Sequence, residues 1–372
     1  MRWWVYILLC TLLSCTTAKE SKEETLTPLY TPKYAKSFSI ALDSLNRKVL
    51  TITNPYQSDK PFEQRVYLLD KEQVAPTSAT SIRVPATKIS TLSSSHVAMI
   101  DAIGAAESIV GVSGVRFLTN EAVRSRATEI GYDSALNFEG IKAAGTDVML
   151  LYGLYGDQSS MTTKLSELGI PYIYIGDYLE ADPLGKAEWM VAVGEIVGKR
   201  EQSIDHFGSI ETRYNAVAES IQEHIGNTPR PKVMLNTPYR DSWFLPSKNS
   251  YMVQLIEQAG GDTFTAEGEG NSSAQIDIEQ AILYATQSDI WLNPSGCNSI
   301  AELVRLNPKF ADTPPITNGK VWNNNARHTP MGGSDFWESG VVRPDIILQD
   351  LAKILHPEIM PAHDLYYHKQ LR

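Results

Sequence analysis

The chain has 372 residues, of which 42% are hydrophobic and 20% are charged, and its formal net charge is −10. This length is sufficient for two hydrophobic cores of ordinary domain size. The acidic balance comes without the clustered lysines and arginines that nucleic-acid binding requires, so we expect no nucleic-acid partner.

The start of the chain has the pattern of an export signal. Arg2 precedes an apolar run of about a dozen residues, which is too short to span a bilayer comfortably. The tetrapeptide Leu12-Leu13-Ser14-Cys15 resembles a bacterial lipobox, in which cleavage precedes a cysteine that carries a diacylglycerol. We therefore predict a signal peptide over residues 1–14, lipidation of Cys15, and a flexible polar tether over residues 15–27. The alternative is an ordinary secretory signal with an incidental cysteine.

Two patterns follow in the first half of the chain. Residues 36–70 alternate polar and apolar side chains, which predicts an antiparallel β meander with a turn at Asn54-Pro55. From Pro85 on, short apolar strands alternate with helical stretches, which predicts a parallel sheet with helices on both faces. We assign residues 28–185 to an N-terminal α/β lobe that includes the meander.

Residues 186–225 interrupt this alternation. Apolar residues recur at helical spacing on both sides of Gly198. The pattern predicts one long helix, kinked at Gly198, or two abutting helices, and we take residues 186–226 as a connecting helix. A second series of strands and helices follows, so we assign residues 227–372 to a C-terminal α/β lobe.

Each half of the chain contains a short helix that starts with a glutamate and leads into a buried strand. Glu139 lies in Asn137-Phe138-Glu139-Gly140-Ile141, and Glu279 lies in Asp277-Ile278-Glu279-Gln280-Ala281. A repeat of this kind indicates two similar lobes, each with one acidic projection. Two lobes form a cleft, and small ligands bind in such clefts.

Neither Cys297 nor the C-terminal histidines suggest a reactive or metal site. With Cys15 lipidated, Cys297 has no disulfide partner in the mature chain. No motif places a base beside Cys297, so we expect a passive, half-buried thiol. His356, His363 and His368 lack metal-ligand spacing and are expected at the surface.

Several segments together resemble the helical-backbone periplasmic binding proteins, which serve ABC importers of iron chelates, haem and cobalamin. The matching segments are Ile89-Ser90-Thr91-Leu92-Ser93-Ser94-Ser95-His96, Ile109-Val110-Gly111-Val112-Ser113, Leu168-Gly169-Ile170-Pro171, Leu255-Ile256-Glu257-Gln258-Ala259-Gly260-Gly261-Asp262 and Leu355-His356-Pro357-Glu358. With Val84-Pro85 and Ala102-Ile103-Gly104-Ala105, which also match, the resemblance extends over residues 84–358. The segment Asp335-Phe336-Trp337-Glu338-Ser339-Gly340 is similar to a subgroup common in Bacteroidota. The resemblance implies an α/β fold of two Rossmann-like lobes joined by a long backbone helix, known as class III. A stiff helical connector permits only small lobe motion.

The resemblance also implies partners. In this family one glutamate per lobe docks into arginine pockets on the two permease subunits, and Glu139 and Glu279 match those positions. Bidentate pairing with arginine would give the docked complex its orientation. The alternative is that each glutamate only favours its own helix N-terminus. We expect a monomer, held to a membrane on the periplasmic side by its lipid anchor, that serves an ABC permease dimer and its ATPase.

The ligand is expected at loops that follow the carboxyl ends of the parallel strands. Aromatic side chains there can cover a macrocycle or a catechol, and arginines can neutralise an anionic chelate. The candidate ligand-binding residues are Ser94, Ser95, His96, Arg116, Tyr152, Tyr155, Arg240, Trp243, Phe244, Asn293 and Arg327.

Three classes of ligand are compatible with this family. Its cobalamin binders often carry a tryptophan six residues before each docking glutamate, where this chain has Asp133 and Ser273. Its haem binders often use a tyrosine or histidine as axial ligand, and His96, Tyr152 and Tyr155 are candidates. An iron–siderophore complex needs no protein–metal bond, because the chelator already fills the coordination sphere of the iron. We therefore expect an iron siderophore, with cobalamin or haem as the alternative, and no resident cofactor or metal.

An enzyme is the main rival class, because many doubly wound α/β folds are enzymes. The sequence has no nucleophile elbow, Walker loop, metal triad or dinucleotide fingerprint. A sensory or adhesion lipoprotein that kept the fold and lost transport is a third class, and the presence of both Glu139 and Glu279 argues against it. We expect a binding protein and not an enzyme.

Overall fold

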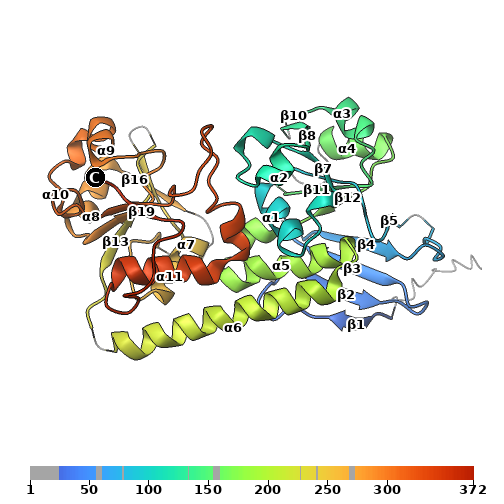
Figure 1. Cartoon of the computed structure of the whole chain (residues 1–372), viewed down its shortest axis with the longest axis horizontal. Coiled ribbons are helices and arrows are strands. Elements are labelled where there is room, and N and C mark those ends of the chain that lie inside the picture. Colours follow the sequence, from blue (N-terminus) through green and yellow to red (C-terminus); the bar gives the residue numbers. More distant parts are fainter. Residues whose placement is uncertain are drawn as a thin grey trace, which may run out of the picture.

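The computed structural model describes residues 25–55, 61–77, 79–132, 134–153, 160–226, 228–239, 242–267 and 273–372. Figure 1 shows two lobes side by side, with helix α6 (Arg200–Ile225) lying below both. The 26 residues of α6 extend about 39 Å at a rise of about 1.5 Å per residue, which is long enough to join the lobes.

The N-terminal lobe contains the predicted β meander. Its five strands pair in chain order, antiparallel from the first to the fourth and parallel between the last two. The strands are β1 (Thr27–Tyr30), β2 (Phe38–Leu42), β3 (Lys48–Thr53), β4 (Glu63–Leu69) and β5 (Ser81–Arg83). The sheet packs on the rest of the lobe through Phe38, whose ring centroid lies 4.8 Å from that of Trp189.

The N-terminal lobe is completed by a parallel sheet in the order β12-β11-β6-β7-β8. Its strands are β6 (Ile89–Thr91), β7 (Ile109–Val112), β8 (Thr128–Glu129), β11 (Val148–Leu151) and β12 (Tyr172–Tyr174), and a hairpin of β9 (Gly131–Tyr132) and β10 (Ala135–Leu136) lies beside it. The helices of this lobe are α1 (Ser94–Ala102), α2 (Glu121–Arg124), α3 (Phe138–Ala143), α4 (Ser160–Glu167) and α5 (Pro183–Ile196). The strand–helix alternation predicted from Pro85 on is confirmed.

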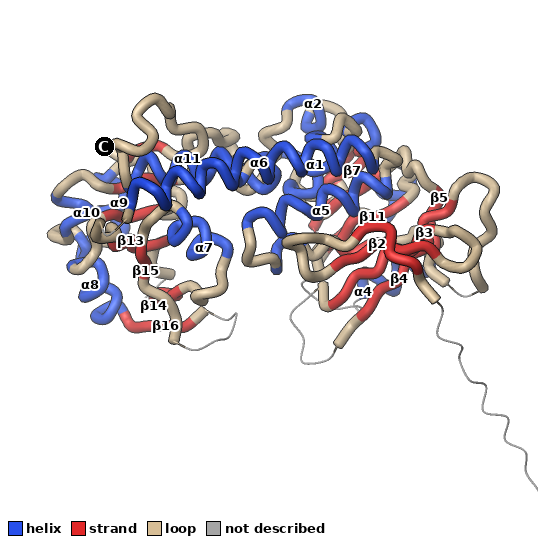
Figure 2. The backbone as a smooth tube through the Cα atoms, turned by 90° about the horizontal axis from the view of Figure 1, so that it is seen from below, coloured by secondary structure: helices blue, strands red, loops and turns tan. Residues whose placement is uncertain are grey.

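The segment predicted as a connecting helix consists of two helices, α5 and α6, so the two-helix alternative is correct. Gly198 separates them with a φ of 69°, a conformation in which a side chain would be strained. All residues of α5 are buried, whereas α6 buries one face and exposes the other. The helix α5 therefore belongs to the core of the N-terminal lobe, and α6 is the helix that runs from one lobe to the other (Figures 1 and 2).

The C-terminal lobe is built on a second sheet in the order β15-β13-β17-β18-β19, which is parallel except for its last strand. Its strands are β13 (Lys232–Leu235), β15 (Asp262–Thr263), β17 (Ile290–Leu292), β18 (Val321–Asn323) and β19 (Lys369–Gln370), and β14 (Ser242–Leu245) pairs separately with β16 (Ala274–Asp277). The helices are α7 (Tyr251–Gln258), α8 (Ile278–Thr286), α9 (Ile300–Leu306), α10 (Pro314–Thr317) and α11 (Pro344–Leu355). The strand β19 brings the end of the chain back into this sheet.

Two expectations about single residues are wrong. His356 and His368 are buried rather than at the surface, and His363 is half-buried. The buried carboxylate of Asp350 accepts hydrogen bonds from His363 Nε2 at 2.7 Å and from the backbone N–H of His368 at 3.0 Å, which ties the C-terminal tail to α11. Cys297 is a free thiol, as expected, but it is fully rather than half buried.

Within the described part of the chain, we find no helix that combines the length and apolar character needed to cross a membrane.

Candidate functional site

The parallel strands of each lobe direct their carboxyl ends towards loops that carry most of the predicted ligand residues. In the N-terminal lobe, Ser94–His96 follow β6, Arg116 lies beyond β7 in a turn at Val115–Phe117, and Tyr152 follows β11. In the C-terminal lobe, Asn293 follows β17 and Arg327 lies beyond β18. This placement agrees with the rule that ligands bind at the carboxyl edge of open α/β sheets.

The start of α1 is buried in a charged cluster of the N-terminal lobe. His96 has no exposed surface, its Nδ1 lies 2.7 Å from Thr91 Oγ1, and its Nε2 lies 3.4 Å from Asp177 Oδ1. Lys186 Nζ lies 3.4 Å from the other oxygen of Asp177. Burial opposes ionisation of Asp177, but Lys186 and His96 outweigh it and lower the pKa of this carboxyl to about 2. His96 therefore supports the loop from within rather than facing a ligand.

Aromatic residues of the C-terminal half lie next to this cluster. Lys186 Nζ is 5.5 Å from the ring centroid of Tyr251, the first residue of α7. The ring centroid of Trp337 lies 6.4 Å from that of Tyr251, and Trp337 as a whole is 46% exposed, so this residue offers an apolar surface at the junction of the lobes. The sequence analysis did not select Lys186, Tyr251 or Trp337 as candidates, although Trp337 lies in a segment that resembles a subgroup of the family.

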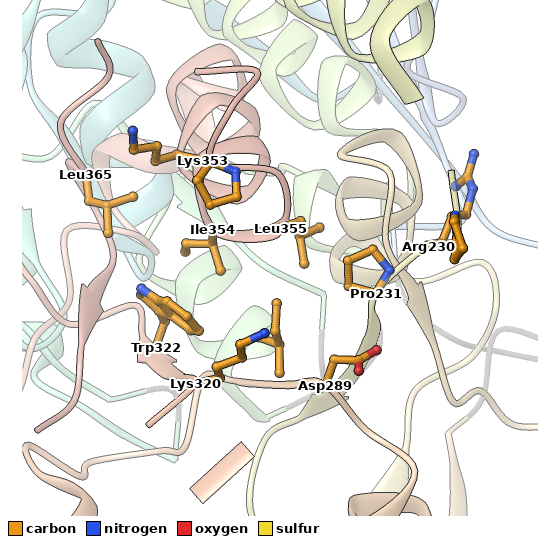
Figure 3. A pocket seen from close by; sticks show the side chains of 12 residues that line it. Arg230, Pro231, Asp289, Lys320, Trp322, Lys353, Ile354, Leu355 and Leu365 are labelled. Atoms are coloured by element: carbon orange, nitrogen blue, oxygen red, sulfur yellow. The ribbon is translucent and has the colours of Figure 1, made fainter. Parts of the chain in front are cut away.

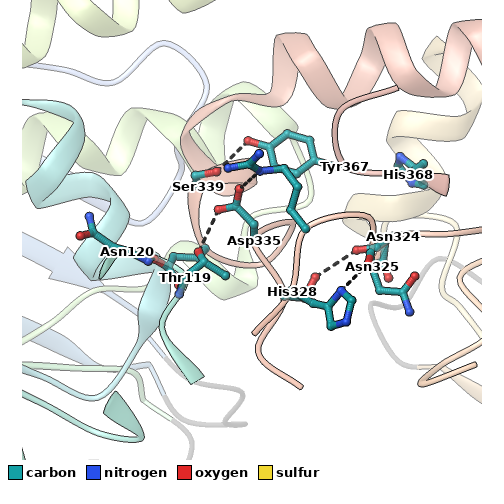
Figure 4. A network of polar contacts seen from close by, with 12 residues as sticks. Thr119, Asn120, Asn324, Asn325, His328, Asp335, Ser339, Tyr367 and His368 are labelled. Carbon is teal, nitrogen blue, oxygen red and sulfur yellow. Dashed lines mark hydrogen bonds and ion pairs between the residues drawn. The ribbon is translucent and has the colours of Figure 1, made fainter. Parts of the chain in front are cut away.

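A polar network joins the two lobes directly (Figure 4). Asp335 accepts a hydrogen bond of 3.0 Å from Thr119 Oγ1 and one of 2.7 Å from Arg327 Nε. The carboxylate of Glu338 accepts from the backbone N–H groups of Thr119 and Asn120, each at 2.7 Å. Burial raises the pKa of Glu338, and the backbone hydrogen bonds oppose this effect only in part. The network brings Arg327, a predicted residue, close to the loop that carries Arg116.

A pocket of about 370 Å³ lies beside this network. It is lined by α1, by the Thr119-Asn120 turn, by His206 of α6 and by residues that follow β18, and it is open to solvent on one side. Arg327 and Arg343 both lie over the ring of Tyr366, at 4.5 and 4.6 Å from its centroid. The volume falls at the lower end of the range for small-molecule pockets, and the lining is charged.

A larger pocket of about 590 Å³ lies within the C-terminal lobe (Figure 3). It is formed where the amino ends of β13, β17 and β18 meet the end of α11, and Trp322, Ile354 and Leu355 contribute its apolar wall. The predicted ligand loops are at the carboxyl ends of the same strands. This pocket therefore lies at the other edge of the sheet and is separate from the predicted site.

The remaining candidates divide between core, surface and undescribed positions. Trp243 is 1% exposed, packs on Trp291 at 5.6 Å between ring centroids, and donates from Nε1 to the Leu235 carbonyl. Phe244, the next residue on β14, is 43% exposed, because successive side chains of a strand point to opposite faces. Trp243 is thus a core residue rather than part of a ligand surface. Tyr155 and Arg240 lie outside the described residues.

The two repeated glutamates occupy equivalent positions. Glu139 is the second residue of α3, whose N-cap Asn137 accepts from Gly140 N–H, and Glu279 is the second residue of α8, whose N-cap Asp277 accepts from Gln280 N–H. Both glutamates are exposed, and Glu279 lies 3.9 Å from Lys309 Nζ in a solvent-exposed pair. One exposed carboxylate therefore projects from each lobe at the start of a capped helix.

No group of three or more histidine, cysteine, aspartate or glutamate side chains within the described ranges is arranged to hold a metal ion.

Comparisons with known proteins agree with this architecture. A lipoprotein of Methanocaldococcus jannaschii, named as uncharacterized, is 25% identical over 382 aligned positions, covering 95% of this chain and 87% of the relative. A periplasmic haem-binding protein from Pseudomonas aeruginosa superimposes with a TM-score of 0.57 and 17% identity, covering 73% of this chain and 93% of that one. The periplasmic vitamin B12-binding protein of Vibrio cholerae superimposes with a TM-score of 0.55 and 16% identity, covering 75% and 99%.

These matches confirm the predicted fold class, while the Bacteroidota subgroup stays a prediction. The model of the periplasmic binding protein family matches residues 89–325, which is more than half of the chain. This protein therefore belongs to the periplasmic binding protein family, whose members bind substrates and are not enzymes.

Proposed function

We propose that this protein captures an iron–siderophore complex between its lobes and delivers it to an ABC importer. The observation that carries this proposal is the meeting of the β7 and β18 loops, which brings one exposed arginine from each lobe to the same junction. Arg116 is exposed beside Phe117, and Arg327 keeps 51% of its side chain exposed while paired with Asp335. Two guanidinium groups would neutralise an anionic chelate.

The choice among ligand classes rests on what the junction offers. His96, one candidate axial ligand for haem, is fully buried and committed to Thr91 and Asp177. A ferric siderophore needs no such ligand, and the exposed ring of Trp337 would pack against its aromatic or aliphatic groups. Haem and cobalamin are the alternatives, since Tyr152 is half-buried at the end of β11 and similar folds bind these tetrapyrroles.

The route of delivery follows from the same family. Glu139 and Glu279 would each meet an arginine on one permease subunit, and the associated ATPase would then drive import. Cys15 would carry the lipid, and residues 15–27 would let the lobes reach the permease from the membrane. The name of the archaeal relative, a lipoprotein, supports this anchoring.

Fluorescence titration of the protein tests the ligand assignment. We expect saturable quenching by ferric siderophores, and weaker or no quenching by haem and cyanocobalamin. Arg116→Ala should weaken siderophore binding about tenfold, which is the loss of one charged contact. Arg305→Ala is the control, because Arg305 is 69% exposed on α9 and pairs only weakly, at 3.9 Å, with Glu302 of its own helix. Saturable binding of haem or cobalamin alone would replace the siderophore assignment.

A further inference from the structure

Residues 327–342 form a segment that leaves the C-terminal lobe after β18 and lies against the N-terminal lobe; we call it the inter-lobe strap. In Figure 1 the chain after β18 is visible as a red loop that rises between the lobes. The strap ends in a 3-10 turn at Ser339–Val342 that packs against α1 and α5 of the N-terminal lobe. Val341 and Val342 of this turn are buried, so the attachment has an apolar part.

The two carboxylates of the attachment are buried. Glu338 is 3% exposed and Asp335 is 5% exposed. Both oxygens of Glu338 are used by N–H groups of the N-terminal lobe, and one oxygen of Asp335 is used by the hydroxyl of Thr119. A buried carboxylate without hydrogen-bond partners is unfavourable in free energy. Separating the strap from the Thr119-Asn120 turn therefore has a substantial free-energy cost.

The backbones also touch. A Cβ atom placed on Gly333 would overlap the carbonyl oxygen of Phe117, so the strap passes the β7 loop at a distance that only glycine allows. The turn around Gly333 is held by its own hydrogen bonds, of 3.0 Å to Thr329 Oγ1 and of 2.8 Å from Thr329 N–H. The part of the strap that contacts the other lobe is therefore a hydrogen-bonded turn of defined conformation.

We propose that the inter-lobe strap is a non-covalent link that sets the separation of the lobes, with Asp335 and Glu338 as its positioning residues. Besides the connection through α6, the helices α7 and α11 of the C-terminal lobe contact α5 of the N-terminal lobe. The strap adds a buried, hydrogen-bonded attachment at residues far from α6 in sequence, and this attachment restricts rotation of one lobe against the other. The loops that carry Arg116 and Arg327 are then held in place before any ligand arrives, which reduces the ordering cost of binding.

Hydrogen exchange of the full-length protein, measured by mass spectrometry without ligand, tests this link. In Glu338→Gln one acceptor oxygen becomes an amide donor that faces an N–H group. We expect the amides of Thr119 and Asn120 to exchange about tenfold to a hundredfold faster, as for loss of a hydrogen bond to a charged group. X-ray scattering should show a larger radius of gyration. Because no ligand is present, this result is independent of the proposed substrate.

The control is Glu180→Gln. Glu180 is also a buried glutamate, and it accepts from Lys36 N–H at 2.9 Å and Trp189 Nε1 at 3.1 Å, all within the N-terminal lobe. Its substitution should accelerate exchange around Lys36 and leave both the Thr119-Asn120 amides and the radius of gyration unchanged.

Two more conservative variants, both at Thr119, test the same link if Glu338→Gln fails to fold. Thr119→Val removes the hydroxyl that donates to Asp335 at nearly constant shape, whereas Thr119→Ser retains it. We expect faster exchange of the strap amides in Thr119→Val and recovery in Thr119→Ser. Equal exchange in both variants, or an unchanged radius of gyration in Glu338→Gln, would overturn the proposal.

Discussion

Glu338 accepts a hydrogen bond of 2.7 Å from the backbone N–H of Thr119, a residue 219 positions earlier in the chain and in the other lobe. The donor is a main-chain group, so its position depends on the turn after β7 and not on a side-chain rotamer. The hydrogen bond therefore ties the orientation of the C-terminal lobe to the backbone of the N-terminal lobe. In addition to the helix α6 between the lobes, the buried carboxylate of Glu338 provides a hydrogen-bonded connection between them.

The contact of Gly333 with Phe117 predicts a large response to a single methyl group. Gly333→Ala should lower the free energy of unfolding by roughly 1–3 kcal/mol, because the added Cβ overlaps a backbone oxygen, which cannot move aside as the end of a flexible side chain can. Urea denaturation followed by circular dichroism would measure the change.

Gly208→Ala provides the matched control. Gly208 lies inside α6 with no atom within 4 Å of an added Cβ, so alanine should raise stability by up to about 1 kcal/mol through its helix propensity. If Gly333→Ala is as stable as the unmodified protein, the two loops do not touch in solution.

The Asp177 cluster predicts a specific loss of stability in acid. The folded-state pKa of Asp177 is about 2, below its ordinary value of 3.8, so its ionised form stabilises the fold above about pH 4. That stabilisation, roughly 2 kcal/mol by linkage, should disappear as the pH falls from about 4 to 2. Urea denaturation at several pH values should show that Asp177→Asn costs stability at pH 7 and little at pH 2.

The control for this experiment is Asp312→Asn, because Asp312 is exposed. Its effect on the free energy of unfolding should be small at every pH. A difference between Asp177→Asn and the unmodified protein that does not change with pH would mean that Asp177 contributes through packing and not through its charge.

Charge reversal at the two repeated glutamates should separate binding from transport. Glu139→Lys and Glu279→Lys should bind ligand with unchanged affinity but reduce uptake and ATPase stimulation, since a permease arginine would lose its partner. The loss corresponds to ~2–5 kcal/mol if the pair is desolvated, and the double variant should be worse than either single one. Variants that bind ligand poorly yet still support transport would assign the carboxylates to the ligand site instead.

The predicted lipidation makes Cys15 the residue that holds the protein to the membrane. Cys15→Ala should release the protein into the soluble periplasmic fraction, and metabolic labelling with a fatty acid should be lost. Cys297→Ala is the control, since Cys297 is buried in the C-terminal lobe and should not affect fractionation. Unchanged processing and membrane association of Cys15→Ala would indicate an ordinary secretory signal.

Much of the fold could be predicted because its signals are local. Alternating strands and helices revealed both α/β lobes, and glycines at Gly104 and Gly260-Gly261 lie just beyond the ends of α1 and α7, where glycine commonly ends a helix. The caps Asn137 and Asp277 lie beside the glutamates they accompany, so the repeat of acidic helix starts was readable as well. Each of these features depends on residues within a turn or two of one another.

The sequence by itself determined the α/β class, the order of the elements and the segments that carry the family resemblance. Only the tertiary structure decided which polar and aromatic side chains are buried: Trp243 became core, and His96 and His368 became partners of buried aspartates. The inter-lobe strap could not be predicted from the sequence either. The N–H groups that donate to Glu338 belong to Thr119 and Asn120, which lie 219 and 218 positions earlier in the chain. Periodicity reports which face of an element is apolar, but not which distant element will cover it.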